Sequence, residues 1–253
     1  MSHFSVGVIV KTPDDLVDAL APFNEQDEQY FVREPQMTLK DYMEWDKFKK
    51  SKEQYIQDLK KAYGDDFDEA KEIVYGNFNP NAKWDWYSIG GRWRYSLKVR
   101  KSAEHIKDID LMGDTIKDQK GKYIRVDGAK IKDIKWNKIL DKNKTPAALG
   151  KFWDDYVDPG LHKAEYPTVE YNAEYYLNKY KTKEQYVSLY SKFYTYALYD
   201  NITEEWIEPG EVGWFGTNNS TIDSLKEYVN KFYEIIESPD YQDYWFIVVD
   251  CHI

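Results

Sequence analysis

Apolar positions predict a strand followed by a helix at the N-terminal end of the chain, and a helix followed by a strand at the C-terminal end. Residues 3–10 (HFSVGVIV) are apolar at nearly every position, which is typical of a buried strand. Residues 12–24 have helical spacing after a Thr-Pro start. Near the other end, residues 222–236 carry an apolar stripe of helical period, and residues 244–253 (YWFIVVDCHI) predict a last strand.

Two more helices are predicted between 38 and 76. Apolar residues recur at spacings of three and four over 38–62, and a shorter run over 66–74 does the same before Gly76. We therefore expect a helical insertion around 38–76 that covers one face of the core. Other expected elements are a strand at 122–126, helices at 147–156, 169–180 and 183–193, and a hairpin over 193–208.

The stretch 80–95 (PNAKWDWYSIGGRWRY) concentrates tryptophan and tyrosine around a glycine pair. Residues 92–99 alternate between aromatic or aliphatic and polar types, which predicts a strand, and residues 84–89 predict its partner. Burying each large ring stabilises the fold by about 2 to 3 kcal/mol. The rings are therefore expected to be mostly core, and the turn from Gly90 to Arg92 is the candidate functional edge.

These elements predict an α+β fold with a mainly antiparallel sheet and helices packed on one face, broadly ferredoxin-like with helical insertions. We expect a single domain over 1–253, because the chain shows neither a linker nor a repeat. A formal net charge of -10 disfavours binding to duplex DNA. The apolar N-terminal run is too short for a signal segment, so a cytoplasmic protein without a membrane partner is expected. The single cysteine, Cys251, excludes an internal disulfide framework and a cysteine-based zinc site.

Histidines stand at both ends of the chain. His3 begins the first predicted strand and His252 ends the last, so antiparallel pairing of these strands would bring the two imidazoles together. Ser5 and Asp250 would lie on the same face, because alternate strand residues share a face. The sequence HFSV matches the short motif of two-histidine phosphoesterases, whose imidazoles act as general base and acid, although His252 lacks the following Ser or Thr of a second motif. The alternative is that both imidazoles are solvated near frayed ends.

A second candidate site surrounds the glycine turn. Arg92 could bind a phosphate or carboxylate, with backbone N–H groups of Gly90 and Gly91 as further donors. The rings expected to stack on a base are those of Trp84, Trp86, Tyr87 and Trp214. The alternative is an aromatic core corner in which Arg92 pairs with Asp85. Walker and GxGxxG motifs are absent and Asp85 and Asp250 are the only further carboxylates near the histidines, so no cofactor or metal is predicted.

Three motifs occur in order along the chain: MSHFSVGVIV, NPNAKWDWYSIGGRW, and VGWFG with a terminal VVDCHI. Together they resemble a family of bacteriophage and prophage proteins that begin MSHF, carry a WDWYxIGGRW block and end in DCHI. The likeness covers most of the chain, and the family's motifs carry no settled activity. The resemblance implies a phage setting and favours an accessory protein that acts against host defence.

Three classes of function remain. The first is a protein that binds and sequesters a nucleotide-like small molecule. The second is a phosphodiesterase that uses His3 and His252, and the third is an acidic protein that inhibits a host defence protein by surface contact. We prefer the first, because aromatic rings that can stack on a base, together with the guanidinium of Arg92, match a nucleotide better than a protein surface. The sequence leaves the oligomeric state open.

Overall fold

The chain divides into two compact units. The computed structural model describes residues 2–46, 49–106, 121–140, 142–158, 172–212 and 218–253. The larger unit joins Met1–Ala19 to Trp86–Ile253, and the smaller unit is Leu20–Asp85. The single domain stays a prediction, and the predicted insertion around 38–76 lies within the smaller unit.

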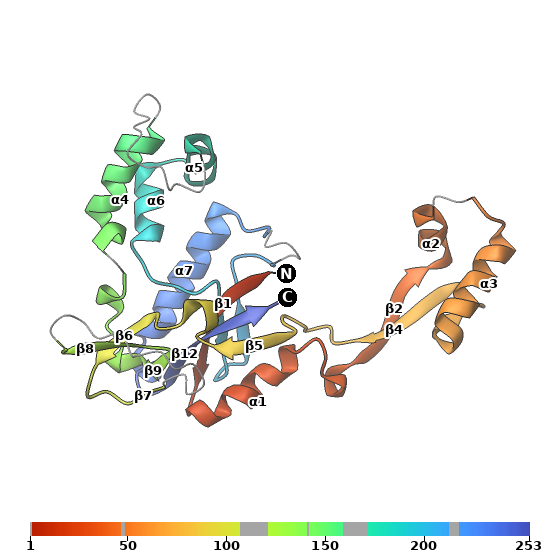
Figure 1. The fold of residues 1–253 in the computed structure, drawn as a ribbon, viewed down its shortest axis with the longest axis horizontal. Helices are drawn as coiled ribbons and strands as arrows, with labels where there is room; N and C mark the ends of the chain where they lie inside the picture. The colour runs from red at the N-terminus through yellow and green to blue at the C-terminus, as the bar shows by residue number, and fades with distance from the viewer. Residues whose placement is uncertain (1, 47–48, 107–120, 141, 159–171, 213–217) are drawn as a thin grey trace. The chain divides into compact units, whose positions relative to one another are not determined.

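Within the described ranges, seven strands form the mixed sheet of the larger unit, with the order β11-β10-β1-β12-β9-β7 and with β5 also paired to β12 (Figure 1). β1 (His3–Val10) runs parallel to β10 (Ala197–Asp200), and the other strand pairs described in this sheet are antiparallel. The remaining strands are β5 (Trp86–Ile89), β7 (His105–Ile106), β9 (Gly128–Lys130), β11 (Glu205–Ile207) and β12 (Trp245–His252). The α+β class with a mainly antiparallel sheet is confirmed, whereas the ferredoxin-like detail stays a prediction.

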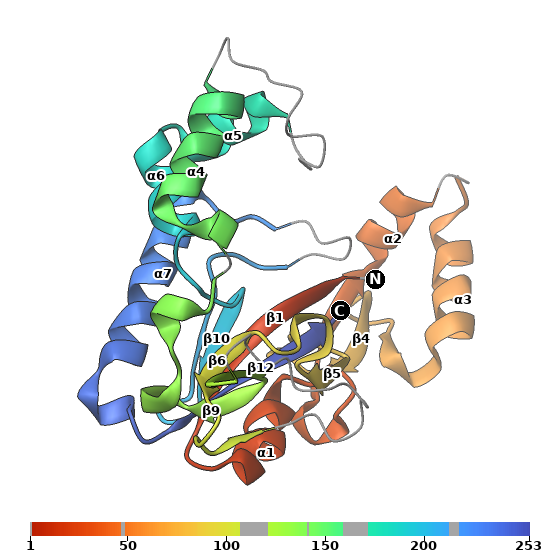
Figure 2. The same cartoon turned by 60° about the vertical axis from the view of Figure 1, so that its left-hand side comes forward.

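The central strands β1 and β12 are buried on both faces, as their continuous apolar sequences require. Ile9 and Val248 belong to the main core together with Phe232 of α7 (Ile222–Glu237). The alternate residues of both strands are buried on the opposite face. Figures 1 and 2 show α7 and the first residues of α1 (Leu16–Leu20) on opposite sides of the β1–β12 pair. Helices therefore flank both faces, because a strand that is apolar on both sides needs cover on both.

Three further helices form an aromatic layer beside α7. They are α4 (Pro146–Phe152), which continues as a π-helical turn (Trp153–Val157), α5 (Ala173–Tyr180) and α6 (Lys183–Tyr190). The rings of Tyr186 and Tyr190 are 4.7 Å apart between centroids, and the hydroxyls of Tyr180 and Tyr190 are 2.9 Å apart. Burial raises the pKa of Tyr180 above its usual value, so its hydroxyl stays protonated. These helices lie where the sequence predicts them.

The smaller unit consists of β2 (Val32–Thr38), β4 (Ile73–Phe78) and β3 (Phe67–Asp68), with α2 (Leu39–Trp45) and α3 (Lys52–Tyr63). The predicted long helix over 38–62 is interrupted, since Ser51 caps a new helix by accepting from the Gln54 N–H. The predicted helix over 66–74 is wrong. Phe67 and Val74 are partners across an antiparallel pair, and Glu72 between them has φ of 58°.

The predicted hairpin between 84–89 and 92–99 is also wrong. β5 pairs with β12, and the following strand β6 (Leu97–Arg100) pairs with β8 (Tyr123–Val126). Residues Gly91–Trp93 form a 3-10 turn and Tyr95 has φ of 60°, so the chain changes direction before β6 begins. The alternation over 92–99 is therefore a strand only in its second half.

Thr221 caps α7, and we expect Thr221→Ala to lower the free energy of unfolding by about 1 kcal/mol. The Thr221 hydroxyl accepts from the Ser224 N–H at 3.0 Å, which satisfies a backbone donor at the helix start. Urea unfolding followed by circular dichroism measures the change. Glu227→Ala is the control, because Glu227 is exposed on the same helix; a loss as large there would contradict the capping role.

Candidate functional site

The two terminal histidines meet at one end of the sheet. In the antiparallel register of β1 and β12, His3 is the partner of His252, and Ser5 is the partner of Asp250. The two imidazole centroids are 4.8 Å apart at an interplanar angle of 74°. The predicted convergence of these side chains on one face is thus present, and the neighbouring strands rather than the chain ends position them.

Asp250 connects the histidine pair to the glycine turn. One carboxylate oxygen, Oδ1, lies 2.8 Å from Nδ1 of His3, and the other accepts from the Arg92 backbone N–H at 2.8 Å. The Asp250 side chain is 3% exposed. Because a carboxylate accepts, the His3 ring carries its hydrogen on Nδ1, which leaves the Nε2 lone pair for other chemistry.

Trp86 completes this group of side chains, which we call the histidine cluster (His3, His252, Asp250 and Trp86). Its indole stacks on His252 with centroids 5.1 Å apart and an interplanar angle of 17°, and it meets the edge of His3 at 5.3 Å. Trp86 is 45% exposed, whereas His252 is 5% exposed. The cluster is therefore an ordered aromatic and charged surface with one open side.

Two buried carboxylates hold the glycine turn. Gly90 has φ of 70° and Gly91 has φ of 48°, both in the left-handed region that favours glycine. A Cβ atom on Gly91 would lie 2.3 Å from Cβ of Asp250, and one on Gly90 would lie 2.6 Å from Oδ1 of Asp127. Asp127 also accepts from the Tyr95 backbone N–H. The Gly90 N–H, which the sequence suggested as a phosphate donor, donates instead to the Val248 carbonyl at 2.8 Å, and the Arg92 N–H donates to Asp250.

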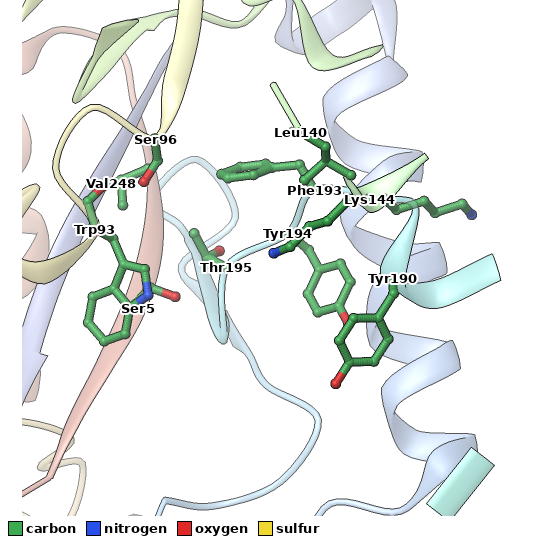
Figure 3. Close-up of a pocket in the computed structure, with 11 residues that line it drawn as sticks. Ser5, Trp93, Ser96, Leu140, Lys144, Tyr190, Phe193, Tyr194, Thr195 and Val248 are labelled. Carbon is green, nitrogen blue, oxygen red and sulfur yellow. Dashed lines mark hydrogen bonds between the residues drawn. The ribbon is translucent and has the colours of Figure 1, made fainter. Parts of the chain in front are cut away.

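A cavity of about 360 Å³ lies beside this turn (Figure 3). Trp93 from the turn and Ser5 from β1 stand on one side in that view, with Tyr190 and Tyr194 on the other. The full lining is Ser5, Trp93, Ser96, Leu140, Lys144, Tyr190, Lys192, Phe193, Tyr194, Thr195 and Val248. All of these residues belong to the larger unit.

The cavity adjoins the histidine cluster along the sheet. Ser5 is two residues from His3 on the same face of β1, a separation of about 7 Å. Its Oγ accepts from the Tyr196 N–H at 3.0 Å, which leaves the hydroxyl hydrogen to donate. A ligand that fills the Ser5 end of the cavity would therefore lie within reach of His3.

The cavity walls combine rings, hydroxyls and cations. Burial raises the pKa of Tyr194 above its usual value, so its hydroxyl is a neutral donor. Lys144 and Lys192 are exposed, and among the residues that the structure covers neither has a carboxylate partner. Lys192 lies over the ring of Tyr233, with Nζ 5.1 Å from its centroid. This chemistry suits an anionic ligand that also carries a planar ring.

Several predicted ligand residues lie elsewhere. Trp84 is 5% exposed in the smaller unit, which fits a core ring and not a stacking platform. Tyr87 is the register partner of Cys251, so it faces away from the histidines, and burial raises its pKa. Asp85 belongs to the smaller unit, and Trp214 lies outside the described residues.

Arg92 is exposed on the turn, and its guanidinium has no ion-pair partner in the described part of the chain. The expected Arg92–Asp85 pair is therefore not observed there. An exposed, unpaired guanidinium next to Trp93 keeps Arg92 a candidate for binding an anion.

Sequence reasoning missed Asp127 and most of the cavity wall. The segment 192–196 (KFYTY) supplies Lys192, Phe193, Tyr194 and Thr195. A lysine next to several aromatic residues is a sequence pattern that could have indicated this binding surface. Trp93 is one of the rings within 80–95 that the sequence predicts to be mostly core, yet it lines the cavity.

The remaining observations concern metal ligands, membrane-spanning helices and similarity to known proteins. The described residues contain no group of three or more His, Cys, Asp or Glu side chains that could hold a metal ion. In the same residues no helix has the length and apolar character needed to cross a membrane. Comparison with protein-family models, curated proteins and solved structures finds no match to this chain.

Proposed function

We propose that this protein binds and sequesters a nucleotide-like small molecule, as a phage accessory protein that counters a host defence from within the host cytoplasm. The observation that carries the proposal is the cavity lined by Trp93, Tyr190, Phe193 and Tyr194 with Lys144 and Lys192 at its wall. Aromatic faces stack on bases of any sequence, and ammonium groups attract phosphate. The cavity supplies both within one compact unit.

The size of the cavity favours a small nucleotide. Its volume of about 360 Å³ is near the lower end of the range of roughly 300 to 1,000 Å³ that is typical of small-molecule sites. A single base with its ribose and phosphate suits that volume better than a dinucleotide does. We therefore expect mononucleotides to bind more tightly than cyclic dinucleotides.

The charge distribution also supports an anionic ligand. The chain has a formal net charge of -10, and many of its described lysines are paired with a carboxylate: Lys50, Lys52, Lys60, Lys71, Lys130, Lys132, Lys151 and Lys183. Lys144 and Lys192 are not so paired within the described ranges. In an acidic protein, two unpaired cations at one cavity attract a negative group more selectively than scattered lysines would.

The phage setting comes from the resemblance of the MSHF, WDWYxIGGRW and DCHI motifs. A phage that must silence a nucleotide signal needs only a protein that holds the ligand. The third class, inhibition of a host protein by surface contact, rests on the net charge alone, and no site in the described structure favours it.

Isothermal titration with AMP, ADP-ribose, 3′,5′-cyclic AMP and a cyclic dinucleotide tests the proposal. We expect binding of at least the mononucleotides, and Trp93→Ala should weaken it by about 1 to 3 kcal/mol, or roughly 5- to 150-fold, through lost stacking. Trp45→Ala is the matched control, because it removes the same ring from an 80% exposed position in the smaller unit. No heat from any of the four ligands with folded protein would refute the proposal.

A further inference from the structure

We infer that the histidine cluster is a phosphodiester hydrolysis site, in which His3 is the general base and His252 the general acid for a cyclic mononucleotide bound in the adjoining cavity. The inference rests on the proposed function for the position of the ligand. It adds cleavage to binding, so the protein would remove a cyclic nucleotide signal by turnover.

The contacts of His3 assign it the role of base. Asp250 holds Nδ1 at 2.8 Å and fixes both the tautomer and the orientation of the ring. Asp250 is itself held by the Arg92 backbone N–H, so the imidazole is attached to a rigid turn. The remaining nitrogen, Nε2, has no hydrogen-bond partner among the described residues and can accept a proton from water.

The contacts of His252 assign it the role of acid. Its ring lies against the face of Trp86, with centroids 5.1 Å apart and a tilt of only 17°. With His3 in the role of base, His252 is the imidazole that remains beside it, with centroids 4.8 Å apart, to give a proton to the leaving oxygen. The two imidazoles differ in environment, one bound to a carboxylate and one stacked on an indole, which separates their roles.

The reaction balances without a further co-reactant. A water molecule gives a proton to Nε2 of His3 while its oxygen forms a new bond to phosphorus. The ester P–O bond breaks, and the leaving oxygen takes a proton from His252. Arg92 lies exposed on the turn whose backbone N–H binds Asp250, so its guanidinium is the candidate group to stabilise charge on the phosphoryl oxygens. The product is a linear monophosphate, and one proton transfer between the imidazoles through solvent restores the site.

The position of the cluster fits this substrate. Ser5 lines the cavity, and His3 is its neighbour on the same face of β1. Cleavage requires the phosphate to lie at the Ser5 end of the cavity, within reach of His3, whereas Lys144 and Lys192 on the cavity wall attract the anionic ligand into the cavity. Trp86, which is half exposed, forms the outer border of the site.

Chromatography of 3′,5′-cyclic AMP and 2′,3′-cyclic AMP after incubation with the protein tests the inference. We expect conversion to AMP isomers, with a bell-shaped dependence of rate on pH, because one imidazole must be neutral and the other protonated. His3→Asn and His252→Ala should each lower the rate at least 100-fold, within the range typical of a lost acid or base. The asparagine amide can still donate to Asp250, so His3→Asn keeps the fold. His105→Ala removes an imidazole outside the cluster and should leave the rate unchanged.

Titration with AMP separates this inference from the proposed function, because AMP has no diester to cleave. AMP binding that persists in His3→Asn, together with the loss of cleavage, supports both the inferred cleavage and the proposed binding function. AMP binding by the unmodified protein without any cleavage of either cyclic nucleotide overturns the inference and leaves the proposed function standing. Cleavage that survives in both histidine variants also overturns it, and absence of binding by AMP and the other three ligands removes the proposed function itself.

Discussion

Gly91→Ala is expected to lower the free energy of unfolding by about 3 kcal/mol or more. Two effects add at this position. The backbone has φ of 48°, a conformation that a residue with a Cβ atom adopts at a cost of roughly 1 to 2 kcal/mol. The new Cβ would also lie 2.3 Å from Cβ of Asp250 and 2.7 Å from Oγ of Ser88, so the turn or the strand must move.

Gly121→Ala is the matched control for this prediction. Gly121 has φ of 63°, yet a Cβ atom there would meet no atom of the described residues within 4 Å. It carries the strain of the backbone conformation without the collision, so its expected cost is about 1 to 2 kcal/mol. Urea unfolding of both variants gives the comparison, and equal losses would show that the contact with Asp250 does not matter.

Gly91→Ala also tests the connection between the glycine turn and the histidine cluster. Movement of Asp250 away from the turn would break its bond to the Arg92 N–H and disturb its contact with Nδ1 of His3. We therefore expect Gly91→Ala to change the NMR chemical shifts of the His3 ring, whereas Gly121→Ala should not. The glycine pair thus has a defined structural role, which is to let the chain pass closely over a buried carboxylate.

The ends of the chain were predictable from sequence because local pattern and burial agree there. β1 and β12 are apolar on both faces, and only a central position in a sheet satisfies such strands. Once the strands are antiparallel neighbours, the period of two places His3, Ser5, Asp250 and His252 on one face. The pairing of the histidines follows from these two facts alone.

The hairpin after Trp86 could not be predicted in the same way. The alternation over 92–99 is real, but the backbone of its first half is bent by contacts to Asp250 and Asp127, which are distant in sequence. Those carboxylates provide acceptors for the N–H groups of Arg92 and Tyr95 that a hairpin partner would otherwise supply. Local propensity cannot reveal an acceptor that lies 32 or 158 residues away.

The helix predicted over 66–74 failed for a related reason. Phe67 and Val74 are seven residues apart, a spacing that fits two turns of helix, but they also face each other across an antiparallel pair.

The cavity could not be predicted from sequence, because its walls come from β1, the turn at Trp93, the end of α6 and the segment 192–195. Only tertiary structure brings these segments together.

Lys192→Glu is expected to weaken AMP binding roughly 100-fold. Hydrogen bonds to charged groups contribute about 1.5 to 3 kcal/mol, and reversal of the charge adds repulsion of the phosphate. Lys192 lines the cavity and has no carboxylate partner among the described residues, so the substitution breaks no ion pair there. Lys144→Glu, on the same wall, should act in the same direction.

Lys179→Glu is the control, because it changes the net charge by the same amount. Lys179 resembles Lys192 in its setting, since its Nζ lies 5.5 Å from the centroid of the Tyr175 ring, but it does not line the cavity. Titration calorimetry at two salt concentrations distinguishes the two effects. If the loss is local, it should appear for Lys192→Glu and not for Lys179→Glu, and added salt should weaken AMP binding more in the unmodified protein than in Lys192→Glu. Equal weakening in both variants would mean that overall charge repels the ligand and that the two cavity lysines do not bind its phosphate.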